Sequence, residues 1–95
     1  MESLLSLNDY CVITFASTSQ ALKAEKVMKE AGAIFLTMPT PREVSASCGL
    51  ALKVQPERVE EYHQLLVGRQ VAIDGVFHLK KEGRKTRVEL LGRGT

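Results

Sequence analysis

The chain has 95 residues, of which 44% are hydrophobic and 25% charged, and its net charge is +2; these values are ordinary for one globular domain with a single modest core. No apolar run approaches the roughly 20 residues of a membrane span, and the first seven residues lack the basic start of a signal peptide, so we expect a cytoplasmic protein with no membrane association. Its two cysteines lie outside any Cys-x-x-Cys motif and predict neither a disulfide framework nor a metal site.

The first two predicted elements are a buried strand and an amphipathic helix. Residues 10–15 are rich in β-branched and aromatic side chains, with apolar residues on both faces, as in a central strand of a sheet. Cys11 lies in this strand and is most simply a core residue. Ser17 and Gln20 have the spacing of a helix-capping box, and Gly32 is the expected end of the helix. The small and apolar residues of the helix form one stripe, which predicts close packing on a sheet.

The middle of the chain contains two further strands and a second helix. Residues 33–38 form an apolar run that Pro39 ends, and residues 50–54 form another. The loop between them begins with Thr40, Pro41 and Glu43, a combination that predicts one short helical turn. A second helix is expected from Pro56 to about Gly68.

The last part of the chain carries the positive charge. Residues 71–79 are a fourth predicted strand, with a bulge or kink at Asp74-Gly75. Residues 1–78 sum to a charge of −2, whereas residues 79–95 sum to +4. We therefore divide the chain into a domain of residues 9–79 and a basic C-terminal tail of residues 80–95, of which residues 86–91 could pair as a short extra strand or stay loose. The tail has no aromatic residue, which argues against a nucleic-acid partner.

The order of these elements predicts the fold class. A β-α-β-β-α-β order is typical of an α+β protein of the ferredoxin-like split βαβ kind, in which an antiparallel four-stranded sheet carries two helices on one face. Right-handed crossovers then give the strand order 4-1-3-2. In this arrangement the first turn of the first helix and the loop before residue 50 share one edge of the sheet. Cys11 lies near the opposite edge, so a disulfide between Cys11 and Cys48 is not expected.

Cys48 is the candidate reactive residue. It lies among small polar residues, and these surroundings suit an accessible thiol, although a buried inert cysteine is an equally open interpretation. No histidine is placed to act as a base for it, which argues against a hydrolytic enzyme and favours a non-enzymatic role. Free amides, hydroxyls and a cation could stabilise its thiolate. The expected stabilising residues are Arg42, Ser45, Ser47, Gly49, Thr18 and Ser19.

Three segments of the chain resemble a known family. Residues 12–18, 21–26 and 41–52 are similar to the selenium/sulfur carrier-like family of small bacterial proteins, and the Arg-Glu-x-Ser-x-Ser-Cys-Gly segment that ends at Gly49 is the most specific part. The resemblance covers roughly residues 9–78. It implies that Cys48 bears sulfur or selenium as a transient persulfide or perselenide, without a resident cofactor. A donor enzyme and an acceptor protein would be its partners.

Two other functions remain open from the residues alone. In the first, the chain is a regulatory or assembly module of the ferredoxin-like kind, which binds a small ligand or a protein, could form a homo-oligomer, and contains Cys48 only incidentally. In the second, Cys48 is a thiol redox sensor. Only the carrier and the sensor require sulfur at position 48, so this residue separates both of them from the module.

Overall fold

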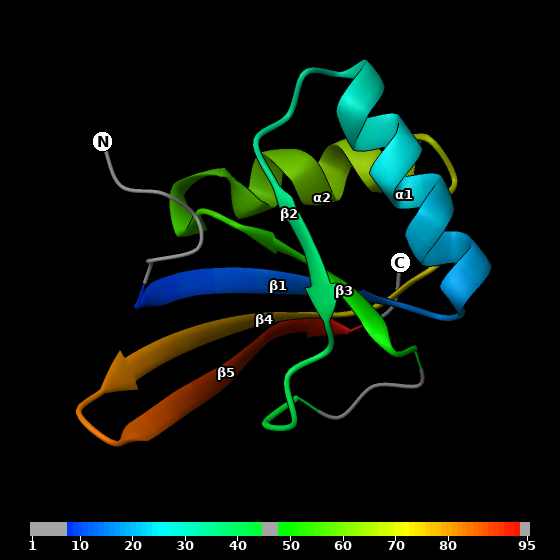
Figure 1. The fold of residues 1–95 in the computed structure, drawn as a ribbon. Helices are drawn as coiled ribbons and strands as arrows, with labels where there is room; N and C mark the ends of the chain where they lie inside the picture. The colour runs from blue at the N-terminus through cyan, green and yellow to red at the C-terminus, as the bar shows by residue number, and fades with distance from the viewer. Residues whose placement is uncertain (1–7, 45–47, 94–95) are drawn as a thin grey trace.

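The computed structural model describes residues 8–44 and 48–93. Ser45 and Ser47 lie outside the described residues, so the roles expected of them stay predictions. The elements in chain order are β1 (Asp9–Phe15), α1 (Thr18–Glu30), β2 (Leu36–Pro39), β3 (Leu50–Val54), the short 3-10 helix η2 (Pro56–Arg58), α2 (Val59–Gly68), β4 (Ile73–Glu82) and β5 (Lys85–Arg93) (Figure 1). Within these described ranges, no helix is long and apolar enough to cross a membrane.

The strands form one antiparallel sheet in the order β2-β3-β1-β4-β5. This confirms the α+β class, the two helices and the order 4-1-3-2 of the first four strands. The expected number of four strands is wrong, because β5 adds a fifth beside β4. The central strand β1 therefore has β3 on one side and β4 on the other.

The added strand comes from the basic segment at the end of the chain. β4 continues to Glu82, past the proposed boundary at residue 80, and the chain turns back so that Glu82 pairs with Lys85. Gly83 has a φ of +63° in this turn, a conformation that favours glycine in a two-residue hairpin. The strand that sequence left open is thus present and nine residues long. Its charged side chains interrupt the apolar pattern by which a strand is predicted from sequence. An edge strand does not need that pattern, because one of its sides faces solvent.

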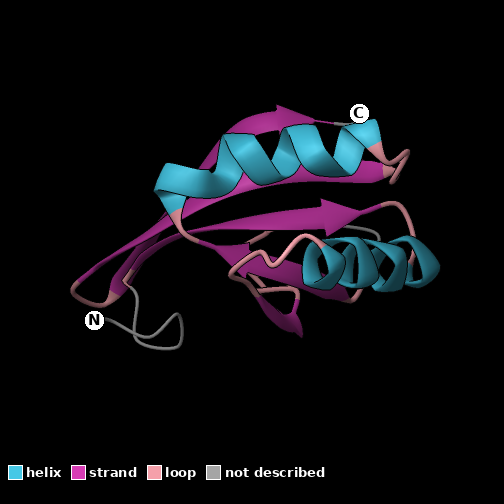
Figure 2. Cartoon of the chain, turned by 90° about the horizontal axis from the view of Figure 1, so that it is seen from above, coloured by secondary structure: helices cyan, strands magenta, loops and turns pink. Residues whose placement is uncertain are grey.

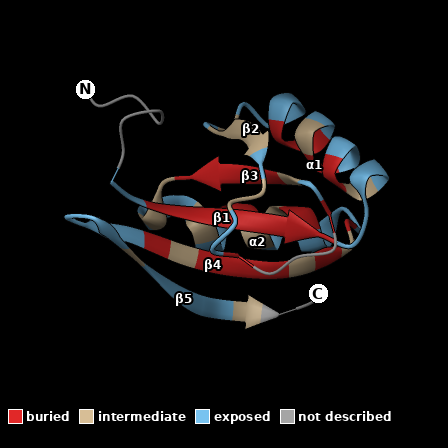
Figure 3. Ribbon diagram, turned by 60° about the horizontal axis from the view of Figure 1, so that its bottom comes forward, coloured by how far each residue is buried: buried red, intermediate tan, exposed pale blue. Residues whose placement is uncertain are grey.

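Both faces of the sheet carry buried side chains, but the helices cover only one face. Alternate residues of β1, including Cys11, Ile13 and Phe15, pack with the buried residues of α1 and α2 in the main core. Figure 2 shows both helices in front of the strands when the molecule is seen from above. A second cluster, which includes Val12 and Phe77, occupies the other face. Figure 3 shows buried residues along β1, β3 and β4, whereas most of β5 is exposed.

The ends of α1 largely follow the sequence. The Ser17 hydroxyl caps the helix by accepting a hydrogen bond from the Gln20 N–H, at 3.3 Å, and Gly32 follows the helix with a φ of +69°. The Gln20 side chain does not complete a capping box. Its Oε1 accepts a hydrogen bond from the Ala72 N–H at 2.8 Å, which ties the start of α1 to the chain before β4.

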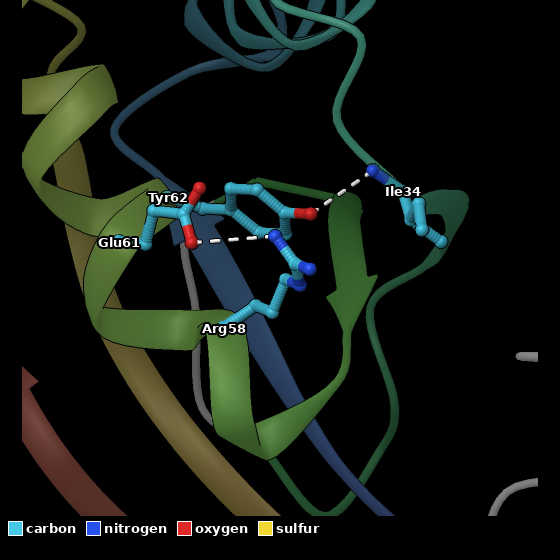
Figure 4. Close-up of polar contacts among 4 residues, drawn as sticks. All are labelled: Ile34, Arg58, Glu61 and Tyr62. Carbon is cyan, nitrogen blue, oxygen red and sulfur yellow. Dashed lines mark hydrogen bonds and ion pairs between the residues drawn. The ribbon is translucent and has the colours of Figure 1, made fainter.

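A tyrosine connects α2 to the segment that precedes β2. The buried Tyr62 hydroxyl accepts a hydrogen bond from the Ile34 N–H at 3.1 Å (Figure 4). Arg58 and Glu61, also drawn in Figure 4, form an exposed ion pair at 3.5 Å on the same helical segment. The tyrosine contact satisfies a backbone group of a segment that has no strand partner of its own, whereas an exposed pair of this kind adds little stability.

The expected irregularity in β4 is confirmed. Thr14 pairs with Gly75 and Phe15 pairs with Ile73, so Asp74 is an extra residue opposite β1. The buried Thr14 hydroxyl donates a hydrogen bond to the Gly75 carbonyl at 3.2 Å. A side chain on Gly75 would place its Cβ 2.8 Å from the Phe77 ring, closer than atoms approach without displacement. Any larger residue at this bulge must therefore displace the Phe77 ring.

We predict that Gly75→Ala lowers the free energy of unfolding by about 1–3 kcal/mol, because the largely buried Phe77 ring must move out of its packed position. Urea denaturation followed by circular dichroism measures the change. Gly68→Ala is the matched control, because a Cβ at Gly68 meets no atom within 4 Å. Equal stabilities of the two variants would contradict the steric argument.

Candidate functional site

The Cys48 sulfur lies between the start of β3 and the start of α1. It accepts a hydrogen bond from the Leu50 N–H at 3.4 Å, and its thiol is positioned to donate a weak one to the Thr18 hydroxyl at 3.9 Å. Ser17 caps α1, so Thr18 is the first residue of the helix. The expectation that Cys48 and the first turn of α1 share one end of the sheet is confirmed at these atoms. An N–H that donates to sulfur binds a thiolate more strongly than a thiol.

The exposure of Cys48 differs from the sequence expectation. Only 3% of the residue is accessible, so the prediction of an accessible thiol is wrong for this conformation. The cause is its packing with the main core, which includes Leu52 of the adjoining strand. Thr18, whose hydroxyl contacts the sulfur, and Gly49, the next residue of the chain, are both exposed. A Cβ placed on Gly49 would meet no atom of the described residues within 4 Å. The thiol therefore lies directly beneath the surface.

Thr40 fixes the backbone around Cys48, and sequence reasoning missed this role. Its hydroxyl donates to the Cys48 carbonyl at 2.8 Å, and its N–H donates to the Gly49 carbonyl at 2.9 Å. These bonds extend the β2–β3 pairing by one step beyond the Pro39–Leu50 pair. The spacing of Thr40, Pro41 and Glu43 had predicted a short helical turn with Thr40 at its start. Residues 42 and 43 instead form a turn, in which the Val44 N–H donates to the Pro41 carbonyl at 3.0 Å.

The other expected site residues are only partly brought together. Ser19 is exposed, and its hydroxyl lies 3.1 Å from that of Ser17 and thus belongs to the cap of α1. Arg42 is exposed in the turn, and among the described residues no hydrogen bond or ion pair joins it to Cys48. The Leu50 amide, which the sequence analysis did not name, takes the place that Arg42 was expected to fill. A backbone amide leaves no trace in sequence composition, so only the register of β3 could have predicted it.

The second thiol has different surroundings. Cys11 is 1% exposed and lies opposite Val54 and His78 in the sheet, whereas Ala51, close to Cys48, lies opposite Thr14 at the far end of β1. Both cysteines are free. Burial, with further contributions from the charges of Asp9 and Glu57, raises the pKa of Cys11 from 9.0 to about 12. Cys11 is therefore a protonated core thiol at neutral pH.

Two hollows in the described part of the chain are lined by residues other than Cys48 and its neighbours. One, of about 280 Å³, is lined by α2, β4 and the end of β5, including His63 and Leu91. The other, of about 450 Å³, lies over β4 and β5 beside His78 and Arg87. Within the described parts of the chain, no three His, Cys, Asp or Glu side chains gather as a metal site would require. The Cys48 site thus offers a sulfur atom and hydrogen-bond donors.

Comparison with known proteins gives one match. A family model described as "Putative Se/S carrier protein-like" matches residues 10–78, which include β1 to α2, most of β4 and both cysteines. No curated protein and no solved structure matches the chain. The matched range ends within β4 and leaves β5 outside it.

We predict that Cys48 is alkylated faster than Cys11 in the native protein at neutral pH. The raised pKa of Cys11 leaves it almost entirely as the unreactive thiol, and it lies in a paired strand, whereas Cys48 lies in a turn beneath exposed residues. Peptide mapping after a limited reaction with iodoacetamide measures both rates. Cys48→Ser should remove the faster phase, and in urea the two rates should converge. Faster labelling of Cys11 would contradict the assignment.

We predict that Cys11 contributes to a loss of stability at alkaline pH. The folded protein holds the Cys11 proton up to a pKa of about 12, while the unfolded chain releases it near 9.0, so stability falls as pH rises through this window. The raised pKa of Tyr10 acts in the same direction, as a background. Urea unfolding at several alkaline pH values should show a shallower decline for Cys11→Ala than for Cys48→Ala. Parallel declines of these two variants would contradict the prediction.

Proposed function

We propose, since this chain belongs to the selenium/sulfur carrier-like family, that Cys48 accepts one sulfur or selenium atom and passes it to a partner protein. The observation that supports this proposal is that the family match over residues 10–78 includes Cys48 together with the groups that contact its sulfur, the Leu50 amide and the Thr18 hydroxyl. A carrier of this kind needs a sulfur that can be reached and donors that stabilise an anion. It needs no catalytic base of its own, and we therefore place the chain among non-enzymatic proteins.

Loading would be a thiol exchange without net oxidation. The Cys48 thiolate attacks the outer sulfur of a donor persulfide, and a new S–S bond forms while the S–S bond of the donor breaks. The donor sulfur leaves as a thiolate and takes up the proton that Cys48 released. A donor perselenide reacts in the same way, with selenium as the transferred atom. The donor enzyme thus supplies the oxidised chalcogen, and Cys48 only receives it.

Delivery would repeat the exchange with the acceptor. A thiolate of the acceptor attacks the outer atom on Cys48, and Cys48 leaves as a thiolate. The Leu50 N–H then donates to an anionic sulfur at the moment when that charge develops. Thr40 keeps this N–H in position, because its hydroxyl and N–H hold the Cys48 and Gly49 carbonyls. Arg42, Ser45, Ser47 and Ser19 remain proposed contributors to binding the transferred anion or the partner.

The burial of Cys48 implies a movement before either exchange. Thr18, whose hydroxyl contacts the sulfur, and Gly49 are both exposed, and no atom of the described residues lies within 4 Å of a Cβ placed on Gly49. We propose that displacement of the turn at Gly49, away from Thr18, exposes the sulfur to a docked partner. The same opening would admit a small persulfide or alkylating reagent to the thiol.

The proposed function also bears on the fold type, the cellular compartment and the need for a cofactor. We propose that β1, α1, β2, β3, α2 and β4 form a ferredoxin-like split βαβ unit, because their order and the order of their strands agree with it. We also propose that the protein works in the cytoplasm, where a persulfide can be returned to a thiol. The loaded chalcogen is cargo, so no resident cofactor is required.

One observation favours a second candidate function. The 3% exposure of Cys48 is that of a packing residue, as expected for a regulatory or assembly module in which the thiol is incidental. In that case a serine at position 48 would weaken the fold, without affecting any chalcogen transfer. The two functions therefore differ in whether the sulfur takes up cargo.

We predict that incubation with a low-molecular-weight persulfide adds one sulfur atom to the reduced protein, and that excess thiol removes it. Intact mass spectrometry measures the addition, and peptide mapping should place it on Cys48. Cys48→Ser should not load, whereas Cys11→Ser should load as the wild type does, because Cys11 is a protonated core thiol.

Two further variants test the geometry. Thr18→Val removes the hydroxyl beside the sulfur at nearly constant volume, and Thr40→Val removes the bond to the Cys48 carbonyl. We expect Thr40→Val to slow loading more, because the Leu50 N–H loses its fixed position. If the folded wild type never loads, or Cys48→Ser loads equally well, the carrier function is wrong and the module takes its place.

A further inference from the structure

β5 is a long edge strand with exposed apolar side chains. It pairs with β4 from Lys85 to Arg93, and within the described residues no strand lies on its other side. Val88 and Leu90 are 38% and 47% exposed, although they pair with buried residues of β4. The opposite edge, β2, has only four residues and ends in Pro39. Edge strands that are long and apolar pair readily with a further strand, whereas short ones ending in proline do not.

The geometry points to a second copy of this chain as the partner of that edge, and we propose that β5 pairs antiparallel with β5 of the second copy. In a closed dimer the two strands are related by a two-fold axis perpendicular to the sheet, which passes beside one residue of each strand. The choice of that residue fixes every pair across the interface. The charges of β5 therefore select among a few possible registers.

Among the registers with the axis beside residues 87 to 90, only one pairs opposite charges without also pairing like charges. An axis beside Val88 places Arg87 opposite Glu89 of the second copy, and the symmetry repeats this pair. An axis beside Arg87 or beside Glu89 instead places two identical charges opposite each other, which is destabilising. The alternation of the strand adds a second argument, because Val88 pairs with Leu79 on the helix-free face. With the axis beside it, the two Val88 side chains meet on that face.

The side chains needed for this contact are free to make it. Arg87 and Glu89 are both exposed and both lie on the face of β5 that pairs with Lys80 and His78. Arg87 has an ion pair with Glu82 at 3.3 Å in the single chain, but such an exposed pair is worth little and can be exchanged. A strand-to-strand interface of nine residues is small, so we expect a weak dimer that depends on concentration.

The test uses charge reversals in full-length protein. Sedimentation equilibrium from about 1 µM to 1 mM should show the wild type changing from 10.5 kDa to about twice that mass. Arg87→Glu and Glu89→Arg should each weaken dimerisation about tenfold or more, because each puts two like-charged pairs across the interface. Lys85→Glu is the matched control. It also changes an exposed charge of β5, but in this register it faces no charged residue, and it should dimerise as the wild type does.

The Val88 register also predicts that complementary charges restore dimerisation. An equimolar mixture of Arg87→Glu and Glu89→Arg should form heterodimers, and the double variant should form homodimers again, because opposite charges then face each other. Val88→Cys should form an intermolecular disulfide on mild oxidation, whereas a cysteine at Lys85 should not. Circular dichroism confirms that each variant is folded. A monomeric wild type up to 1 mM, unchanged dimerisation of both reversals, or a mixture that fails to associate would overturn the proposal.

Discussion

The pairing of β1 with β3 determines where the chemistry of this protein lies. Because Thr14 faces Ala51 and Cys11 faces Val54, the end of β1 and the beginning of β3 meet at the same end of the sheet. The chain leaves β1 there and begins α1 within three residues, and it enters β3 there from the Cys48 turn. A two-residue slip in this register would separate the Thr18 hydroxyl from the Cys48 sulfur by about 7 Å along the strand.

The same register distinguishes the two cysteines. Both belong to the helix-side core, yet they lie at opposite ends of the sheet. Cys11 is enclosed by paired strands on both sides, and its neighbours Asp9 and Glu57 add negative charge, so every influence on it favours the thiol. Cys48 lies where strand pairing ends, next to a backbone N–H. The two sulfurs therefore have similar exposure but different surroundings, because only Cys48 is shown with a backbone N–H donor at its sulfur.

The sequence predicted those features that depend on local chemistry or on elementary topology. The Ser17 cap, the end of α1 at Gly32, the bulge at Asp74 and the order of four strands are of this kind. It missed features that depend on long-range contacts. Thr40 holds the Cys48 carbonyl only because β2 and β3 pair. The burial of Cys48 follows from its packing against the core. β5 forms a strand because it pairs with the free edge of β4. Lys53 is a further example. Its side chain is buried, with the Nζ atom 4.2 Å from the centre of the Tyr10 ring, and this burial lowers the pKa of Lys53.

The strand order places the proposed carrier site and the proposed dimer edge on opposite sides of the sheet. Cys48 belongs to the side of the sheet formed by β2 and β3, while β5 lies beyond β4, so β1 and β4 separate the edge strand from the site. A second copy paired through β5 would leave the turn at Gly49 uncovered, and each subunit could still present its own Cys48 to a partner. The family match gives the same division, because it ends at residue 78 and includes the site without β5. In the proposed dimer, the charges of the last segment would serve assembly through their alternation along β5, independently of the chemistry proposed at Cys48.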